Sequence, residues 1–224
     1  NKTTTVTTTI WSYTALDQVL RMMRTTVDNG VTTTENDTVN RIYDSRGRLT
    51  YSKTSVTEAG TGLSKDYTVE TSLTAYNTLD QVLRMIRGTV DNGVTTTEID
   101  RGGGFSDPIF GLYSGGRTYD SRGRLTSFIT TVTEAGGTLN HTYLSYTKDI
   151  TYNTINQIMR AFQGTLDGNL YTYGIDSADR AYDTRGRIIH SWVNMREWGT
   201  NPTGVGLTNH PEAQTLPYAY LDHS

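Results

Sequence analysis

The chain has 224 residues, a formal net charge of −3, no cysteine and only 34% hydrophobic residues. A phosphate-binding surface usually carries a basic excess, so this balance argues against a nucleic-acid partner, and the lack of cysteine excludes disulfides and Cys-ligated metals. No apolar run approaches the roughly 18 residues of a membrane span, and with about 42 threonines and 15 tyrosines we expect tyrosine to carry much of the burial.

Tight hairpins are the first elements that the chain predicts. Asn-Gly between strand-like flanks is a strong hairpin signal, because a type I′ turn needs positive φ at both central residues. In the third occurrence the order is reversed, but both residues tolerate positive φ. The three predicted turns are Asn29-Gly30, Asn92-Gly93 and Gly168-Asn169.

A second kind of turn alternates with the first. We expect longer, glycine-containing turns at 57–60 and 133–136. The third copy keeps Glu197 and Gly199 and then extends the loop through residues 202–206. The segment Gln81–Met85 is too short for more than one helical turn, and a helix there would deprive a hairpin of its first strand, so we interpret it as strand.

The chain is a tandem repeat. Tyr43–Thr50 recurs identically at Tyr119–Thr126 and in similar form at Tyr182–Ile188. Variants of the same string at Tyr13, Tyr76 and Tyr152 give six half-units, with steps of about 30, 33, 43, 33 and 30 residues. An insertion at 101–115 explains the longest step. We therefore predict an all-β fold of tandem β-hairpin repeats forming a curved or coiled sheet, in three units at 1–63, 64–139 and 140–224.

The residues of the repeated string favour a structural function. An Asp or Asn after tyrosine accepts a backbone amide and fixes a turn, and glycine, Asp or Asn at the later position tolerates positive φ. We expect the arginine to lie over the tyrosine of the next unit or to pair with its aspartate. The motif residues are Tyr13, Asp17, Gln18, Tyr43, Asp44, Gly47, Arg48, Tyr76, Asn77, Asp80, Gln81, Tyr119, Asp120, Gly123, Arg124, Tyr152, Asn153, Asn156, Gln157, Tyr182, Asp183, Gly186 and Arg187.

The string Tyr-Asp-x-x-Gly-Arg-Leu at Tyr43–Leu49 resembles the YD repeat of Rhs and teneurin-type proteins. The resemblance extends from about Tyr13 to Ile189. Alternate half-units depart from the pattern, because Asp or Asn replaces the glycine and Gln replaces the arginine. In that family the repeats build a long sheet that winds into a barrel or hollow shell, which is what the resemblance implies here.

Catalytic patterns are sparse in this sequence. The four histidines show no metal-ligand spacing, and the carboxylates recur with the repeat, so we predict no catalytic residue, no metal and no cofactor. The segment Asp107–Leu112 is similar to the self-cleavage motif of Rhs shells, but it has one extra residue and lies within the array, and we interpret it as an exposed loop. Sequons occur at Asn1, Asn36 and Asn140.

The leading hypothesis is a non-enzymatic structural subunit of an extracellular or cell-surface fibre or tube, polymerising with itself through sheet edges. Neither end shows the polar cap that a solitary repeat protein needs. Two alternatives stay open. One is a fragment of a large Rhs-like shell or cell-surface protein that encloses or presents another domain, and the other is a glycan-binding adhesin module using Trp11, Trp192 and Trp198.

Overall fold

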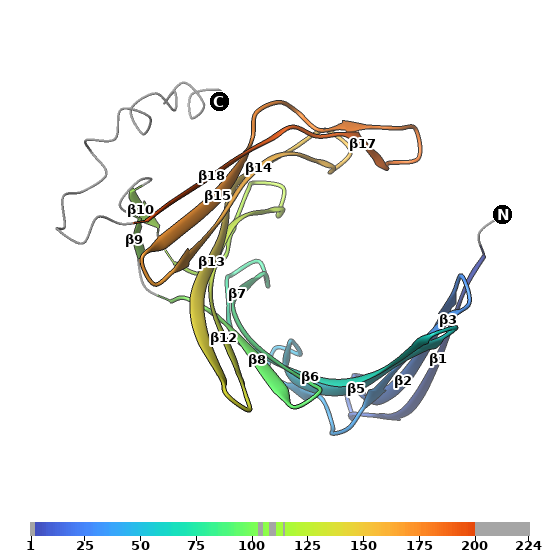
Figure 1. Cartoon of the computed structure of the whole chain (residues 1–224). Helices are drawn as coiled ribbons and strands as arrows, with labels where there is room; N and C mark the ends of the chain where they lie inside the picture. Colours follow the sequence, from blue (N-terminus) through green and yellow to red (C-terminus); the bar gives the residue numbers. More distant parts are fainter. Residues whose placement is uncertain (1–2, 103–104, 108–110, 114, 200–224) are drawn as a thin grey trace. The chain divides into compact units, whose positions relative to one another are not determined.

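The computed structural model describes residues 3–102, 105–107, 111–113 and 115–199, and all its regular elements are β-strands (Figure 1). The all-β prediction is confirmed, and the segment Gln81–Met85 is not helical: Gln81 precedes the strand β7 (Val82–Asp91), which contains Val82–Met85. Among the described residues no helix is long and apolar enough to cross a membrane.

The chain divides into two compact units. Unit 1 comprises Asn1–Asp100 and Thr130–Thr142, and unit 2 comprises Arg101–Ile129 and Tyr143–Ser224. The division into three tandem units, drawn from the sequence period, stays a prediction.

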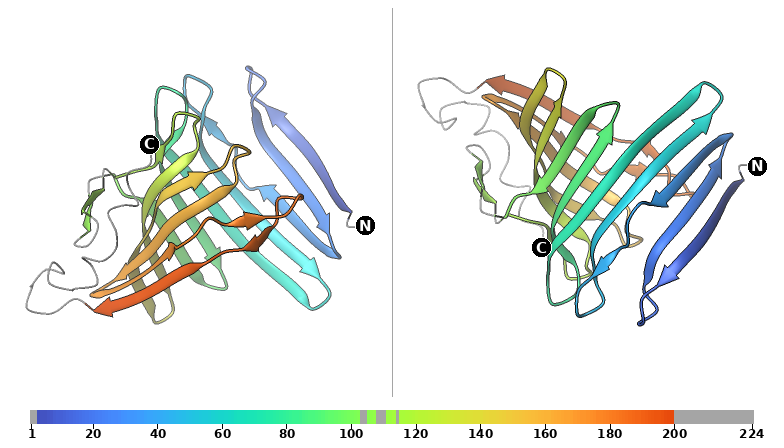
Figure 2. Two further views of the ribbon diagram at one scale, coloured as in Figure 1. Left: turned by 90° about the horizontal axis from the view of Figure 1, so that it is seen from above. Right: turned by 90° about the horizontal axis from the view of Figure 1, so that it is seen from below.

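Unit 1 is a succession of antiparallel hairpins, in which most strands pair with the next one along the chain (Figure 2). The order of pairing is β1-β2-β3-β5-β6-β7-β8, β4 pairs with the first part of β5, and Thr130–Ala135 pairs with β8. The strands are β1 (Thr4–Tyr13), β2 (Val19–Asp28), β3 (Val31–Asp37), β4 (Ile42–Tyr43), β5 (Leu49–Gly60), β6 (Leu63–Tyr76), β7 (Val82–Asp91) and β8 (Val94–Asp100).

Unit 2 repeats this arrangement with β13-β14-β15-β18 as its main order, and β9 and β10 of the insertion pair only with each other. The long strands β12 and β13 contribute residues to both units. In the described residues the pairing path runs from β1 to β18 and does not close. The strands are β9 (Phe105–Asp107), β10 (Gly111–Tyr113), β11 (Thr118–Tyr119), β12 (Leu125–Gly136), β13 (Leu139–Tyr152), β14 (Ile158–Asp167), β15 (Leu170–Asp176), β16 (Ala181–Tyr182), β17 (Ile188–His190) and β18 (Val193–Gly199).

The Asn-Gly hairpins form as predicted. Asn29 and Gly30 have φ values of 51° and 78°, and the second Asn-Gly pair has nearly the same values. In the third copy Gly168 has a φ of 55°, whereas Asn169 is not among the described residues with positive φ. Positive φ at the first central residue alone is typical of a type II′ turn, so the reversed order changes the turn type.

The predicted longer turns at 57–60 and 133–136 were wrong. The strand β5 continues to Gly60, which pairs with Leu63, and the turn consists of Thr61 and Gly62. A Cβ on Gly60 would lie 3.2 Å from the carbonyl oxygen of Gly30. A side chain at Gly60 would crowd this neighbouring turn, and the residues that turn the chain lie just beyond Gly60. The loop predicted at 202–206 lies outside the described residues.

The hydrophobic core of unit 2 is aromatic. Ile129, Tyr146, Phe162 and Tyr173 are buried together. The Phe162 ring stacks on Tyr146 and Tyr173, with ring centroids 5.7 and 5.4 Å away. Gly164 lies opposite both tyrosines in the sheet, and any side chain there would collide with the Tyr146 ring. Tyrosine carries much of the burial in this unit, as the composition predicted.

Candidate functional site

The repeated motif forms a tight, heavily hydrogen-bonded turn. At Tyr43–Arg48 the amide of Asp44 donates to the carbonyl of Arg48, and the amide of Gly47 donates back to the carbonyl of Asp44. One carboxylate oxygen of Asp44 accepts the amides of Arg46 and Arg48, each at 2.9 Å. The other accepts Nε of Arg48 at 2.7 Å. The same bonds recur at Asp120 and Asp183.

The alternate half-units build the same turn from different side chains. Asn77 accepts the amides of Leu79 and Gln81, at 2.9 and 3.0 Å, and Asn153 does the same in its own turn. In the first half-unit the acceptor is the hydroxyl of Thr14, a residue that the sequence reasoning did not single out. Asp17, Asp80 and Asn156 have φ values of 59°, 60° and 65° where the other half-units have glycine. Asp and Asn are the residues that best tolerate this conformation after glycine.

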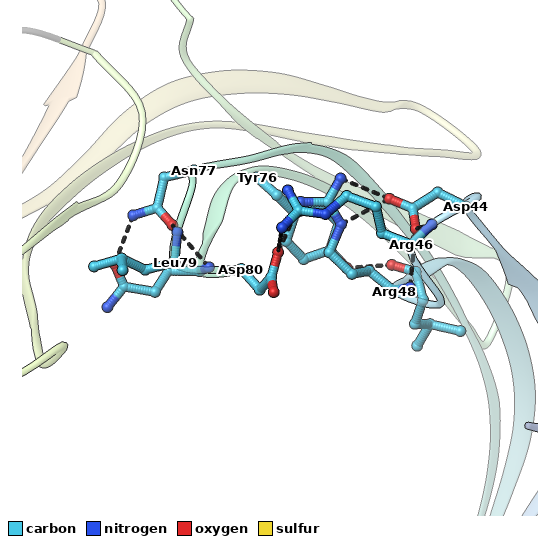
Figure 3. Close-up of polar contacts among 9 residues, drawn as sticks. Asp44, Arg46, Arg48, Tyr76, Asn77, Leu79 and Asp80 are labelled. Carbon is cyan, nitrogen blue, oxygen red and sulfur yellow. Dashed lines mark hydrogen bonds and ion pairs between the residues drawn. The ribbon is translucent and has the colours of Figure 1, made fainter.

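The motif arginines join successive half-units (Figure 3). The guanidinium of Arg48 lies 4.5 Å from the ring centroid of Tyr76, and its Nη1 donates to Asp80 at 3.0 Å. In unit 2, Arg124 lies 4.6 Å from the ring centroid of Tyr152 and donates to Asn156. The expected stacking and pairing are thus both present.

The motif tyrosines add a second link between half-units. Each of four tyrosine hydroxyls donates to the carbonyl that lies six residues after the preceding motif tyrosine. The donor and acceptor pairs are Tyr43 to Val19, Tyr76 to Leu49, Tyr152 to Leu125 and Tyr182 to Ile158. We call this series the tyrosine ladder. Tyr119 is half-buried in β11.

The glutamines of the motif brace the turns. The carboxamide oxygens of Gln81 and Gln157 accept the side chains of Asn77 and Asn153 at 2.6 Å. A Cβ on Gly47 would lie 2.8 Å from Nε2 of Gln18 in the preceding half-unit. The glycine therefore serves both the turn and the close approach of a neighbouring turn. Gly186 lies near Gln157 in the same way, and Gly123 has a positive φ of 80° like the other motif glycines.

The electrostatics of the motif oppose acid-base catalysis. Backbone amide hydrogen bonds, first that of Arg48, hold the pKa of Asp44 below its usual value, and amides of Arg124 and Arg187 do the same for Asp120 and Asp183. Burial raises the pKa of Tyr76 and Tyr152. A carboxylate whose anionic form is already satisfied by donors is a weak base. The motif is therefore suited to holding strands together.

Three buried aspartates complete the repeat, and the sequence reasoning missed them. Asp37 is 1% exposed, and its carboxylate accepts the amide of Met22 at 2.9 Å, Nε of Arg41 at 2.9 Å and the hydroxyl of Thr54 at 3.2 Å. Asp100 and Asp176 likewise accept the amides of Met85 and Ala161. The sequence did contain a signal, because an Asp ends the strand that follows each of the three tight hairpin turns. In two of the three copies an arginine follows four residues later, at Arg41 and Arg180.

The third buried aspartate lacks one hydrogen bond, which leads to a prediction. Thr54 and Thr130 stand opposite Asp37 and Asp100 and donate to them, but Val193 stands opposite Asp176, whose Oδ1 is buried without a partner. We expect Val193→Thr to raise the free energy of unfolding by about 1 kcal/mol, the value of one satisfied buried acceptor. Urea titration measures it. Val193→Ala is the control, and equal stability of the two variants would contradict the prediction.

The other candidate residues form no shared site. Of the described histidines, His141 lies 3.6 Å from Glu134 and His190 contacts Trp192 edge-on. No group of three metal-binding side chains gathers in the part of the chain that the structure describes. The sequon at Asn36 lies within the paired strand β3, and that at Asn140 is exposed in β13. His210, His223, Asn1 and the side chains of Asp107 and Trp198 lie outside the description.

A polar groove in unit 1 occupies the positions that form the aromatic core in unit 2. Counted from the motif tyrosines, Lys53, Glu70, Ile86 and Thr97 correspond to Ile129, Tyr146, Phe162 and Tyr173. The groove measures about 270 Å³, and a Cβ on Gly88, which lines it, would meet nothing within 4 Å. Lys53 and Glu70 pair across it at 3.0 Å. Its lining is polar and aliphatic, so it offers no aromatic platform for a sugar.

No family model, curated protein or solved structure matches this chain.

Proposed function

We propose that the chain is a non-enzymatic structural subunit of an extracellular fibre or tube, and that it polymerises through the edges of its sheet. The observation that carries the proposal is the exposed edge of strand β1. This strand is ten residues long, is exposed along nearly its whole length, and pairs on one side only among the described residues. Such a strand presents a row of backbone donors and acceptors that another strand can satisfy.

The composition of β1 supports the proposal. Natural edge strands are usually protected by charge, proline, short length or a bulge. The strand TTVTTTIWSY contains no charged residue and no proline, and its pairing with β2 is regular from Thr4 to Ile10. The exposed Val6 and Trp11 add apolar area to this edge. Apart from the irregular pairing at Trp11–Tyr13, this edge is unprotected and is suited to adding a strand.

The motif turns support a structural function within a YD-type repeat. Their carboxylates and carboxamides accept the backbone amides that fix the turns, and their arginines and tyrosines join successive half-units. These contacts agree with the family resemblance, which remains part of the proposal.

Negative-stain microscopy and sedimentation of the purified chain test the proposal. We expect ordered polymers above a threshold concentration, and Thr7→Lys with Thr9→Lys, placed in the middle of β1, to suppress them. Thr68→Lys, in the internal strand β6, is the control for an added charge away from the edge. A monodisperse monomer at every concentration would refute polymerisation.

A fragment of a large Rhs-like shell or surface protein is the second candidate, because further repeats in the same polypeptide would cover the same edges. Sequencing the DNA on both sides of the coding segment decides it, since this candidate requires more copies of the Tyr-Asp motif in frame.

The glycan hypothesis predicts saturable sugar binding that is lost in Trp198→Ala. Trp11 and Trp192 are each about half exposed.

A further inference from the structure

Among the described residues, the last motif arginine binds the aspartate of its own turn but has no contact with a later half-unit. Arg187 binds Asp183 through Nε at 2.7 Å, as Arg48 and Arg124 bind Asp44 and Asp120. Its side chain is 71% exposed, compared with 21% for Arg48 and 20% for Arg124. The described residues that follow Arg187 include no tyrosine that it could cover.

The first motif tyrosine shows the complementary half of the same contact. Tyr13 is 53% exposed, and its hydroxyl has no partner among the described residues. Asp17, four residues later, is exposed and occupies the position of Asp80 and Asn156, which accept Arg48 and Arg124. The ring, the hydroxyl and the carboxylate that an arginine joint requires are therefore all present at the start of the array.

The segment that follows Arg187 is divided into two strands, and among the described residues β18 pairs only with β15. Counted from the motif tyrosines, β17 and β18 together correspond to the single strand β5, and the break at Ser191 and Trp192 corresponds to Ser52 and Lys53. In unit 1 those two residues pair with β6. Around the break several apolar side chains are exposed: Ile188, Ile189, Trp192, Val193 and Met195.

We infer that a second copy of this chain completes the joint head to tail, with β1 of one copy pairing with β18 of the next as β6 pairs with β5. This inference rests on the proposed polymerisation and specifies its interface. Arg187 then covers the Tyr13 ring of the next copy and donates to Asp17, while the Tyr13 hydroxyl donates to the carbonyl of Ile188. The tyrosine ladder thereby continues across copies.

The internal repeat also sets the register of this joint. Val193 lies eleven residues after its motif tyrosine, as Thr54 does, and Val6 lies seven residues before its own, as Val69 does. Thr54 pairs with Val69 and Ser55 pairs with Thr68. In the joint, Val193 therefore faces Val6 of the next copy, and Asn194 faces Thr5. The interface is heterologous, so repeated addition produces a ring or an open filament.

Disulfide trapping between two separately tagged single-cysteine chains tests the register, since the natural chain has no cysteine. We expect disulfides for Val6→Cys mixed with Val193→Cys or for Thr5→Cys mixed with Asn194→Cys, because one of two consecutive antiparallel pairs brings the Cα atoms to about 4.5 Å. Ile10→Cys mixed with Val193→Cys lies four residues out of register and should remain unlinked. Equal trapping of that control would overturn the register.

Tyr13→Ala tests the side-chain contact. We expect association to weaken about tenfold, because the variant loses both the cation-π contact and the hydroxyl bond. The urea midpoint of the dilute chain should stay unchanged, since Tyr13 makes neither contact within its own copy. Leu16→Ala, in the same exposed turn, is the matched control and should associate normally. Asp17→Asn should also associate, because Asn156 serves the internal joint in unit 2.

The outcomes separate this joint from polymerisation itself. Polymers that form without in-register disulfides would overturn the joint and leave edge polymerisation standing. A disulfide that forms within one chain carrying both Val6→Cys and Val193→Cys, at any dilution, would show that β1 and β18 of the same chain pair and would also overturn it. Absence of association at every concentration would refute both proposals.

Discussion

Replacing Asp37 with alanine is expected to lower the free energy of unfolding by about 3–5 kcal/mol, the usual cost of removing one partner of a buried ion pair. The variant leaves the guanidinium of Arg41, whose side chain is only 20% exposed, without its carboxylate. It also removes the acceptor of the Met22 amide and of the Thr54 hydroxyl. Urea denaturation followed by circular dichroism measures the loss.

Two controls isolate the origin of that loss. Asp66→Ala removes an exposed aspartate from β6 and should change stability by less than about 0.5 kcal/mol. The double variant Asp37→Ala with Arg41→Ala should lose less than the sum of the single losses, because the two side chains are coupled. A cost near 1 kcal/mol for Asp37→Ala would show that the buried network contributes little.

Phe162→Ala is expected to have a loss of the same size, about 3–5 kcal/mol. Phe162 is 4% exposed and stacks between two buried tyrosines, so its removal leaves a cavity that rigid rings cannot fill. The repeat provides a matched control, because Ile86 occupies the corresponding position in unit 1 and is 38% exposed. Ile86→Ala should cost less than about 2 kcal/mol. Equal losses for the two variants would contradict an aromatic core confined to unit 2.

Local signals in the sequence predicted most of the turns. Asn29 and Gly30 form a type I′ turn because their own backbone preferences require it, and Asp44 fixes the motif turn through amides two and four residues away. The contact of Arg48 with the next half-unit was also expected, because a repeat places equivalent side chains at a regular spacing. Each of these features depends on a few residues that are either close together in the sequence or regularly spaced, so the sequence alone predicts it.

Features that depend on several strands were not predicted. Gly60 was assigned to a turn because glycine is common in turns, but it ends a strand at a point where the backbone of Gly30 approaches closely. Asp37 was overlooked because its partners lie 15 to 17 residues away, on strands whose register the sequence does not reveal. Thr14 was overlooked because a hydroxyl replaces the carboxamide or carboxylate of the other half-units.

By itself, the sequence determined an all-β chain of hairpins, the positions of its tight turns and the residues that repeat, since each follows from backbone preference or period. Only the tertiary structure decided which strands pair in which register, that the aspartates at the strand ends are buried, and that equivalent positions form an aromatic core in unit 2 but a polar groove in unit 1. Those outcomes depend on which side chains meet across strands far apart in the chain, and that is fixed only when the strands pair.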